Sequence, residues 1–287
     1  MLDLLLCLAY FPIVSFTRAY KEATIACIGH DNLKNSIILY NGAMSAFSLL
    51  EAVGALRFRF FVEGPVEDCG AGVYASDPYY AAVVWLFFAS KYIEWLDTVF
   101  LILKDKPTSV LHRLHHVGAP VAVGLLWHSR APFAWLFIAL NGTVHFFMYG
   151  YYLLCLLGKG PRWARPWITR GQIAQFLSGF LIFWVRYSET AAWGTCGLGQ
   201  QVAFWYQYAY VGVVLLLFAN FYLVNYLGEE AKKNKTAAAP EKGVVSGPRV
   251  FFAAWCLILT GTFLHFHSSS GVIGTLGDAL AAAREAW

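Results

Sequence analysis

Residues 80–103 read YAAVVWLFFASKYIEWLDTVFLIL, an apolar stretch long enough to cross a lipid bilayer as a helix. The stretch nevertheless carries Lys91, Glu94 and Asp97, followed by Thr98. Spacings of three and four residues place these side chains on one face of a helix. Because each charged side chain inside a bilayer costs about 2.5–3.5 kcal/mol, the charges must pair or face a polar cavity. The stretch therefore predicts a membrane helix bundle with a polar interior, and an ion-pair network that only joins two helices is the alternative.

The composition also indicates a membrane protein. Of the 287 residues, 59% are hydrophobic and 13% are charged, whereas about 25% of residues are charged in an ordinary soluble chain. No basic run with interleaved aromatic residues is present, so the sequence gives no indication of nucleic-acid binding. The first residues lack the basic segment of a cleaved signal peptide, and we interpret the apolar stretch there as a retained membrane helix.

Seven apolar segments are long enough, or nearly long enough, to cross a membrane. They are residues 2–17, 36–56, 80–103, 117–129, 132–157, 171–187 and 201–227. The segments 2–17 and 117–129 fall below the usual lower limit of about 17 residues, and we expect the second to be extended by the histidines that precede it. The predicted fold is all-α: a polytopic membrane bundle of seven transmembrane helices that encloses a substrate tunnel and occupies residues 1–228.

The C-terminal part of the chain differs from the bundle in composition. Residues 229–249 form a charged linker, which we expect in the cytosol, and residues 250–287 form a tail that begins with the apolar run 250–264. That run is short for a membrane span, so a re-entrant helix, an interfacial helix and an eighth crossing all remain open.

The basic residues predict an orientation, because cytosolic loops are enriched in Lys and Arg. If the N-terminus is lumenal, most basic residues at the segment ends fall on the cytosolic side, and the acidic loop of residues 63–77 falls on the other. Cys69 and Cys196 then both lie in lumenal loops. Because the lumen is oxidising, we predict a Cys69–Cys196 disulfide that joins the helices on the closed side of the bundle.

A group of three histidines precedes the fourth apolar segment. His112, His115 and His116 recur at i, i+3 and i+4, so their imidazoles share one face of a helix at the predicted cytosolic end. We call these three residues the histidine box. Polar groups this dense beside a bilayer are a functional hypothesis by default, and they can serve either as metal ligands or in covalent chemistry.

Two further polar groups recur at helical spacing in later segments. They are Asn141, His145, Tyr149 and Tyr152 in segment 132–157, and Thr169, Gln172 and Gln175 at the start of segment 171–187. Taken singly, a membrane histidine often only packs, tyrosines form interfacial belts and glutamines join helices. All four polar groups nevertheless map to the cytosolic halves of the third to sixth segments, and one polar chamber explains them together.

A membrane di-iron desaturase or hydroxylase is the main metal-dependent enzyme that this pattern could indicate, since His-x-x-His-His also occurs in such enzymes. Of the eight histidines in this chain, only the histidine box and His145 are suitably placed, which is too few imidazoles for two irons. A mononuclear zinc site lacks a fourth ligand with sensible geometry, so we expect no metal. A non-enzymatic lipid transporter would carry charges through the whole depth of the membrane, whereas here the charges stop at one side.

Together the four polar groups resemble the signature of the ELO family of very-long-chain fatty acid elongases. The chain carries K-x-x-E-x-x-D-T at 91–98, H-x-x-H-H at 112–116, H-x-x-M-Y-x-Y-Y at 145–152 and T-x-x-Q-x-x-Q at 169–175. The resemblance implies a seven-helix, multi-pass enzyme of the endoplasmic reticulum membrane. It also implies a 3-ketoacyl-CoA synthase that condenses long-chain acyl-CoA with malonyl-CoA, releases CoA and CO2, and has no tightly bound cofactor.

The same resemblance implies partners. Membrane lipids surround such an enzyme, and a ketoreductase, a dehydratase and an enoyl reductase complete the elongation cycle. The NADPH of that cycle is used by the other enzymes, and no dinucleotide-binding motif is present here. A homodimer is left open, as are the preferred length and unsaturation of the acyl chain.

The family chemistry requires a group that accepts the acyl chain. None of the six cysteines lies in a motif, so an imidazole nucleophile is expected, and His115 is the central histidine of the box. His112 and His116 flank it, and His116 and Asp97 are expected to fix its reactive tautomer. We expect His145 to polarise the malonyl carbonyl or to assist decarboxylation.

Other residues are expected to bind the substrates. The candidate hydrogen-bond donors to an enolate oxygen are Asn141, Gln172 and Tyr149, and the other motif residues expected in the chamber are Lys91, Glu94, Tyr152 and Gln175. The candidate cations for the CoA phosphates are Lys104, Arg113, Arg165 and Arg170, with Lys232 and Lys233 in the linker that follows the bundle. Arg suits bidentate contact with phosphate, although each of these cations also satisfies the positive-inside pattern alone.

Overall fold

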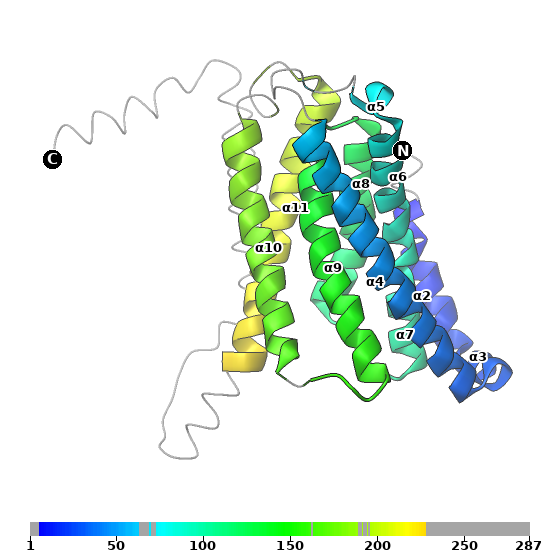
Figure 1. Cartoon of the computed structure of the whole chain (residues 1–287). Helices are drawn as coiled ribbons and strands as arrows, with labels where there is room; N and C mark the ends of the chain where they lie inside the picture. The colour runs from blue at the N-terminus through cyan, green and yellow to red at the C-terminus, as the bar shows by residue number, and fades with distance from the viewer. Residues whose placement is uncertain are drawn as a thin grey trace, which may run out of the picture. The chain divides into compact units, whose positions relative to one another are not determined.

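The computed structural model describes residues 6–62, 69, 73–161, 163–188, 191, 194 and 196–227 (Figure 1). The predicted linker 229–249 and the tail 250–287 lie outside the described residues, and so do the candidate cations Lys232 and Lys233.

The regular elements of the described part are all helical, which confirms the all-α prediction there. They are α2 (Tyr10–Ala19), α3 (Lys21–Ile28), α4 (His30–Phe61), α5 (Val73–Ser76), α6 (Pro78–Ile93), α7 (Trp95–Leu103), α8 (Val110–His128), α9 (Ala134–Leu156), α10 (Ala164–Tyr187), α11 (Leu198–Tyr222) and the π-helical turn η3 (Leu223–Leu227). By length and hydropathy alone, α4 and the continuous helix Leu198–Tyr226 qualify as membrane spans. The seven-span count and the tunnel therefore stay predictions.

The long helices lie side by side in a bundle (Figure 1). α4 packs most extensively against α9, α10 packs against both α9 and α11, and α8 packs against α11 and α6. The short helix α2 packs against α7. The bundle therefore brings the second, third and fourth polar groups, on α8, α9 and α10, toward the first group on α6 and α7.

The charged segment 80–103 is divided at Glu94 into α6 and α7, whereas the sequence predicted one continuous helix. The backbone keeps helical geometry there, and the Asp97 amide donates to the Glu94 carbonyl at 3.0 Å, in a tighter turn than an α-helix. Lys91 lies in the last turn of α6, and Asp97 and Thr98 lie in the first turn of α7. The tight turn therefore lies within the first motif itself.

Small residues allow α4 and α9 to approach closely. A Cβ atom at Gly142 would lie only 2.6 Å from the Ser48 carbonyl oxygen and 3.1 Å from the Ala52 nitrogen. One turn away, Ser45 Oγ donates to the Phe146 carbonyl at 2.9 Å. Close approach at small residues is the usual way in which membrane helices associate, and it places the polar face of α9 at a fixed depth against α4.

An aromatic cluster fills the end of the bundle near the starts of α6, α9 and α11. Phe58 stacks on Tyr80 with ring centroids 3.7 Å apart, and Phe133 contacts Phe183 and Tyr187 at 5.1 and 5.5 Å. These rings are buried and belong to the main hydrophobic core. The core closes this end of the bundle and leaves room for a cavity at the other end.

A disulfide joins Cys69 to Cys196 at the aromatic end, with Cα atoms 5.2 Å apart. This is the pairing that the sequence predicted, while its location in the lumen stays a prediction. Gln200 Nε2 donates to the Cys69 carbonyl at 2.6 Å, so the start of α11 is also tied to the segment before α5.

Asp77 caps the N-terminus of α6. Its Oδ1 accepts from the amides of Tyr79 and Tyr80 at 3.1 and 3.2 Å, and its Oδ2 lies 2.6 Å from Arg57 Nη1. Burial opposes ionisation of Asp77, but the Arg57 guanidinium and the two amides outweigh it and hold the pKa of the carboxyl below its ordinary value. The cap therefore stays ionised near neutral pH and fixes where α6 begins.

Replacing Gly142 tests the close approach of α4 and α9. In Gly142→Ala the new methyl group would strike the Ser48 carbonyl, and overpacking of this kind costs about 1–3 kcal/mol. The matched control is Gly212→Ala on α11, where the nearest atom lies at an ordinary 3.6 Å and Ala is favoured over Gly by about 0.5–1 kcal/mol in a helix. Thermal unfolding in detergent should give a lower midpoint for Gly142→Ala and an equal or higher one for Gly212→Ala. Equal midpoints for the two variants would contradict the packing.

Removing the disulfide should destabilise the bundle. The bond closes a loop across a sequence separation of 127 residues, and loss of a disulfide costs about 2–5 kcal/mol. We expect Cys69→Ala with Cys196→Ala to lower the thermal midpoint, whereas the control Cys27→Ala, at an exposed free thiol, should leave it unchanged. Peptide mapping after alkylation without reductant should label Cys27 and spare Cys69 and Cys196; labelling of both would show that the bond is absent.

Candidate active site

The histidine box occupies the first turns of α8. Ser109 caps the helix by accepting the His112 amide on its Oγ at 3.1 Å. Further along, Pro120 lacks an amide proton, so the carbonyl of His116 loses its donor within the helix. Trp95 Nε1 on α7 donates to that carbonyl at 2.7 Å. The proline therefore links the box to the charged segment, because the Trp95 side chain on α7 supplies the missing hydrogen bond.

The three rings of the box pack on one another. The centroids of His112 and His116 lie 4.2 Å apart, and those of His115 and His116 lie 5.4 Å apart. His145 on α9 approaches from the other side, with its centroid 6.4 Å from that of His115. The two helices thus bring together the four histidines that the sequence predicted as a group.

A buried charged group lies beside the box. Lys91 Nζ donates to Glu94 Oε1 at 2.5 Å and to Asn141 Oδ1 at 2.9 Å. Asn141 Nδ2 lies 3.1 Å from His145 Nε2, and His145 Nδ1 lies 3.5 Å from Glu94 Oε1. Lys91 and Glu94 are 3% and 2% exposed, which is possible because each charge has its partner within the group. Asn141 therefore connects the charged pair Lys91–Glu94 to the imidazole of His145.

Asp97 makes a different contact from the one expected. Its Oδ2 accepts from the Tyr149 hydroxyl at 2.8 Å, and the Tyr149 ring packs edge-on against Tyr40 and His145. The expected role of Asp97 in fixing the His115 tautomer therefore stays a prediction. The contact shown makes Asp97 a partner of the phenol.

A cavity of about 660 Å³ opens beside these residues. Its lining includes most of the predicted site residues, namely Glu94, Asp97, His112, His115, His116, Asn141, His145, Tyr149, Tyr152, Gln172 and Gln175. Thr169 lines it as well, and Gln172 Nε2 lies 3.5 Å from Met148 Sδ. Polar residues from α7, α8, α9 and α10 thus share one chamber, as the sequence predicted.

The cations predicted to bind CoA separate into two sets. Lys104 and Arg165 line the large cavity, together with Lys106, which the sequence reasoning did not include. Arg113 is exposed and does not line the cavity. Arg170 donates from Nε to the Tyr222 hydroxyl at 2.8 Å and lies over aromatic rings, outside the cavity lining.

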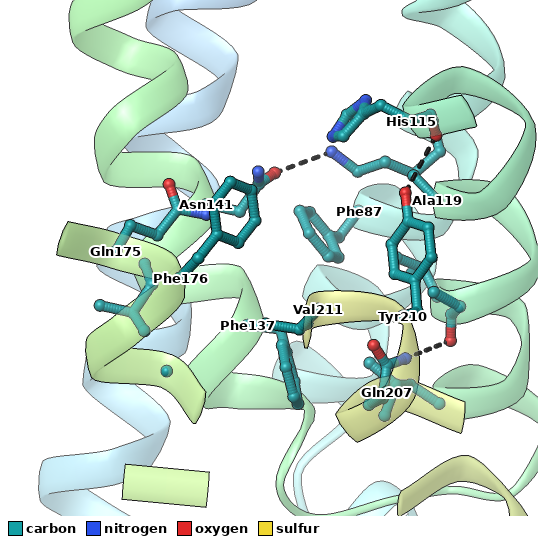
Figure 2. Close-up of a pocket in the computed structure, with 16 residues that line it drawn as sticks. Phe87, His115, Ala119, Phe137, Asn141, Gln175, Phe176, Gln207, Tyr210 and Val211 are labelled. Carbon is teal, nitrogen blue, oxygen red and sulfur yellow. Dashed lines mark hydrogen bonds between the residues drawn. The ribbon is translucent and has the colours of Figure 1, made fainter. Parts of the chain in front are cut away.

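A second, smaller cavity of about 70 Å³ continues from the first into the bundle (Figure 2). Its walls are largely apolar, formed by residues such as Phe87, Leu126 and Phe137. It shares His115, Asn141, Gln175 and Phe176 with the large cavity. His115 and Asn141 therefore stand at the boundary between a polar chamber and an apolar one.

Two polar side chains of α11 support the box and were missed by the sequence reasoning. Figure 2 shows Tyr210 donating to the His115 carbonyl, at 3.1 Å, and Gln207 donating to the Ala122 carbonyl, at 2.5 Å. A Cβ at Gly118 would strike the Tyr210 ring at 2.3 Å, so glycine allows the ring to lie against α8. In the sequence, the signal that could have identified them is a glutamine followed three residues later by a tyrosine within the last apolar segment.

Glu51 on α4 was missed as well. It is 5% exposed, and its Oε1 makes no hydrogen bond within the described residues. A single carboxylate in the middle of an apolar segment is the same kind of signal that identified Lys91 and Glu94. Glu51 is therefore a further buried acid next to the charged group.

The geometry of metal binding is not met in the described part of the chain. No cluster of three or more His, Cys, Asp and Glu residues there is arranged to hold a metal ion. Ring nitrogens of His112 and His145 contact protein groups instead: His112 Nε2 lies 2.8 Å from Thr98 Oγ1, and His145 Nε2 lies 3.1 Å from Asn141 Nδ2.

Comparison with known proteins places this site in a family. The chain matches the model of the GNS1/SUR4 family, ELO, over residues 2–234. It is 37% identical over 72% of its length to "Putative fatty acid elongase 1" of Schizosaccharomyces pombe, of which it spans 63%, less than two thirds. It is 29% identical over 83% of its length to "Very long chain fatty acid elongase 2" of Rattus norvegicus, of which it spans 88%. It is 28% identical over 70% of its length to "Very long chain fatty acid elongase 3" of Homo sapiens, of which it spans 75%.

The family match covers the four motifs whose residues meet around the two cavities, and it extends over most of the chain. The chain therefore belongs to the GNS1/SUR4 family, ELO.

Proposed function

We propose that this helical membrane protein is a very-long-chain fatty acid elongase, a 3-ketoacyl-CoA synthase that condenses long-chain acyl-CoA with malonyl-CoA. The observation that carries the proposal is the position of His115 where the polar cavity meets the apolar one. A long-chain acyl-CoA has a polar CoA part and an apolar chain on either side of its thioester. The reacting carbonyl of such a substrate belongs at a boundary of this kind, and the names of the relatives support the same reaction.

The first step of the proposed reaction acylates His115. A neutral imidazole nitrogen attacks the thioester carbonyl, the new N–C bond forms, the C–S bond breaks, and the CoA thiolate leaves. The product is an acyl-imidazole, and the imidazole proton goes to the departing sulfur. The hydrogen bond from Tyr210 to the His115 carbonyl fixes the turn that carries the nucleophile.

The second step uses malonyl-CoA. Its C–C bond to the carboxylate breaks, CO2 leaves, and the electron pair passes to the thioester as an enolate. The enolate carbon attacks the acyl-imidazole carbonyl, so that a C–C bond forms and the N–C bond to His115 breaks. The departing nitrogen takes up the one proton that the overall reaction consumes from solution, which restores the neutral imidazole. Lys91, Asn141 and His145 are hydrogen-bonded to one another beside His115, and a preorganised donor to an enolate oxygen is worth about 3–4 kcal/mol.

Exclusion of water protects the intermediate, because an acyl-imidazole hydrolyses readily. Apolar side chains such as Phe87, Phe137 and Phe176 form much of the lining of the smaller cavity, and an acyl chain that enters there would displace water from the reacting carbonyl. The endoplasmic reticulum membrane, with a ketoreductase, a dehydratase and an enoyl reductase nearby, is the setting in which the 3-ketoacyl-CoA product would be reduced to the elongated acyl-CoA.

A burst of CoA before malonyl-CoA is added tests the acyl-enzyme. Wild-type protein mixed with acyl-CoA alone should release CoA and gain the mass of one acyl group, as measured by intact-protein mass spectrometry. His115→Ala should lose both signals. His145→Ala should still be acylated but should release no CO2 from malonyl-CoA. The control His30→Ala, at an exposed histidine away from the cavities, should behave as wild type.

The competing account is direct condensation in a ternary complex, with the histidine box acting only as acid and base. It predicts no adduct and no early CoA release from a preparation that elongates normally, and this result would exclude the covalent step. A preparation that neither elongates nor releases CO2 under any conditions would instead contradict the proposed function.

Neutralising the cavity cations tests the CoA site. Lys104→Gln and Arg165→Gln remove charges that line the large cavity. The Michaelis constants for both CoA substrates should therefore rise about tenfold to a hundredfold, the effect of losing a charge-assisted phosphate contact worth about 1.5–3 kcal/mol. The turnover number should change little. Lys159→Gln, at an exposed lysine in the loop after α9, is the matched control. A fall in turnover at unchanged Michaelis constants would argue against phosphate binding.

A further inference from the structure

We propose that Tyr10 on α2, outside the four motifs, is a positioning residue that acts through Thr98 to fix the tautomer of His112. The kinetic consequence of this inference rests on the proposed function, but the tautomer itself does not. The inference gives the N-terminal helix a part in the active site, where the sequence indicated only a membrane segment.

The Tyr10 hydroxyl is buried and has one direction in which to donate. Tyr10 is 1% exposed, and its Oη lies 3.1 Å from Thr98 Oγ1, which is its one hydrogen-bond partner among the described residues. The ring is held edge-on against Phe11 and Trp95, with centroids 5.8 and 5.6 Å away. Since a buried phenol normally donates its proton, Tyr10 donates to Thr98.

Thr98 then passes the direction of donation on to His112. Its Oγ1 accepts from Tyr10, so its own proton is available for His112 Nε2, 2.8 Å away. Thr98 is 1% exposed, which keeps water from this exchange. His112 Nε2 is therefore the acceptor, and the ring proton resides on Nδ1.

The reverse order of donation is less stable. If His112 Nε2 carried the proton, the protons of His112, Tyr10 and Thr98 would share only two contacts. The Thr98 oxygen can accept from both neighbours or from one, but in either case one hydroxyl proton would have no acceptor in the described residues. Leaving a buried donor unpaired costs about 1–3 kcal/mol, which corresponds to a roughly fivefold to hundredfold preference for the Nδ1–H tautomer. The imidazolium form of His112 is disfavoured by the same argument, because it also needs Nε2 to donate.

The orientation of the His112 ring affects the proposed nucleophile through ring packing. The His112 ring lies 4.2 Å from that of His116, which in turn lies 5.4 Å from that of His115. The Tyr10 ring is also parallel to the His116 ring, within 2°, at 6.5 Å. His112 lines the large cavity, so its Nδ1–H is a neutral donor in the chamber where the thioester would lie.

The first test is kinetic. Tyr10→Phe keeps the ring and removes only the hydroxyl, so we expect the turnover number to fall about tenfold to a hundredfold, by analogy with the loss that follows when the partner orienting a metal-bound imidazole is removed. The Michaelis constants for both CoA substrates should stay within about twofold. Thr98→Val should cause a similar loss, and Thr98→Ser, which keeps the hydroxyl, should retain most of the activity. Tyr20→Phe, at a tyrosine that is 53% exposed, is the matched control.

The second test reads the tautomer directly and needs no substrate. Protein labelled with 15N-histidine, with His112 assigned by its loss in His112→Gln, should show an unprotonated Nε2 and a protonated Nδ1 for His112. In Tyr10→Phe and in Thr98→Val the resonances should shift toward a mixture of tautomers, whereas Thr98→Ser and Tyr20→Phe should match wild type.

The outcomes separate the two proposals. A protonated Nε2 in the wild-type spectrum overturns the inference, and so does an unchanged turnover in Tyr10→Phe. If Tyr10→Phe does not fold, the wild-type spectrum and the comparison of Thr98→Val with Thr98→Ser decide the question. A correct tautomer in a wild-type protein that does not elongate would contradict the proposed function and leave the hydrogen-bond order standing.

Discussion

The buried pair Lys91–Glu94 is the constraint on which the rest of the site depends. Removing one partner of such a pair leaves an uncompensated charge and costs about 3–5 kcal/mol. The helices must therefore pack so that Lys91 and Glu94 stay in contact. Asn141 on α9 completes the coordination of Lys91, and His145 faces Glu94. This requirement fixes the depth of α9 against α6 and α7, and the close approach of α4 at Gly142 holds α9 there. Packing at small residues and charge pairing therefore specify the same arrangement of helices.

Satisfaction of backbone groups explains how the histidine box is held. In a membrane no water is available to a carbonyl that lacks its helical donor. Pro120 creates such a carbonyl at His116, and the indole of Trp95 binds it. Tyr210 and Gln207 make further bonds to the carbonyls of α8 from the opposite side. The backbone of the box is thus bonded from both α7 and α11. The bond from Trp95 replaces the missing helical donor of the His116 carbonyl, whereas the bonds from Tyr210 and Gln207 are additional bonds to carbonyls that also accept within α8. These hydrogen bonds restrict the movement of the box, which suits a nucleophile that must meet a carbonyl in a narrow space.

Periodicity predicted much of this site from the sequence. Residues at three- and four-residue spacing share a helix face, so the motif residues on α7, α8, α9 and α10 could be expected in one chamber, and they line it. Spacing gives no information about the angle between helices. It therefore could not show that Tyr10 on α2, or Gln207 and Tyr210 three residues apart on α11, face the histidine box. The same limit applies to the cations. A position at a helix end places Arg113 and Arg170 near the mouth, but the helix face decides whether they reach the cavity, and these two do not line it. The tight turn at Glu94 had no signal in the sequence, because neither Gly nor Pro marks it.

The large cavity has a polar lining and the smaller one a largely apolar lining, and the two linings meet different requirements. A polar group buried without a partner costs about 1–3 kcal/mol, so a polar chamber inside a membrane is stable only if its side chains bond to one another or to a ligand. Lys91, Glu94, Asn141 and His145 do so among themselves, and Asp97 does so with Tyr149. The smaller cavity has a largely apolar lining that includes Phe87, Phe137 and Phe176, and such walls offer few hydrogen-bond partners to water. Because His115 borders both, it has polar neighbours on one side and apolar neighbours on the other. In the part of the chain that the structure describes, this boundary is where the proposed nucleophile would meet the carbonyl of a substrate whose polar and apolar parts occupy different cavities.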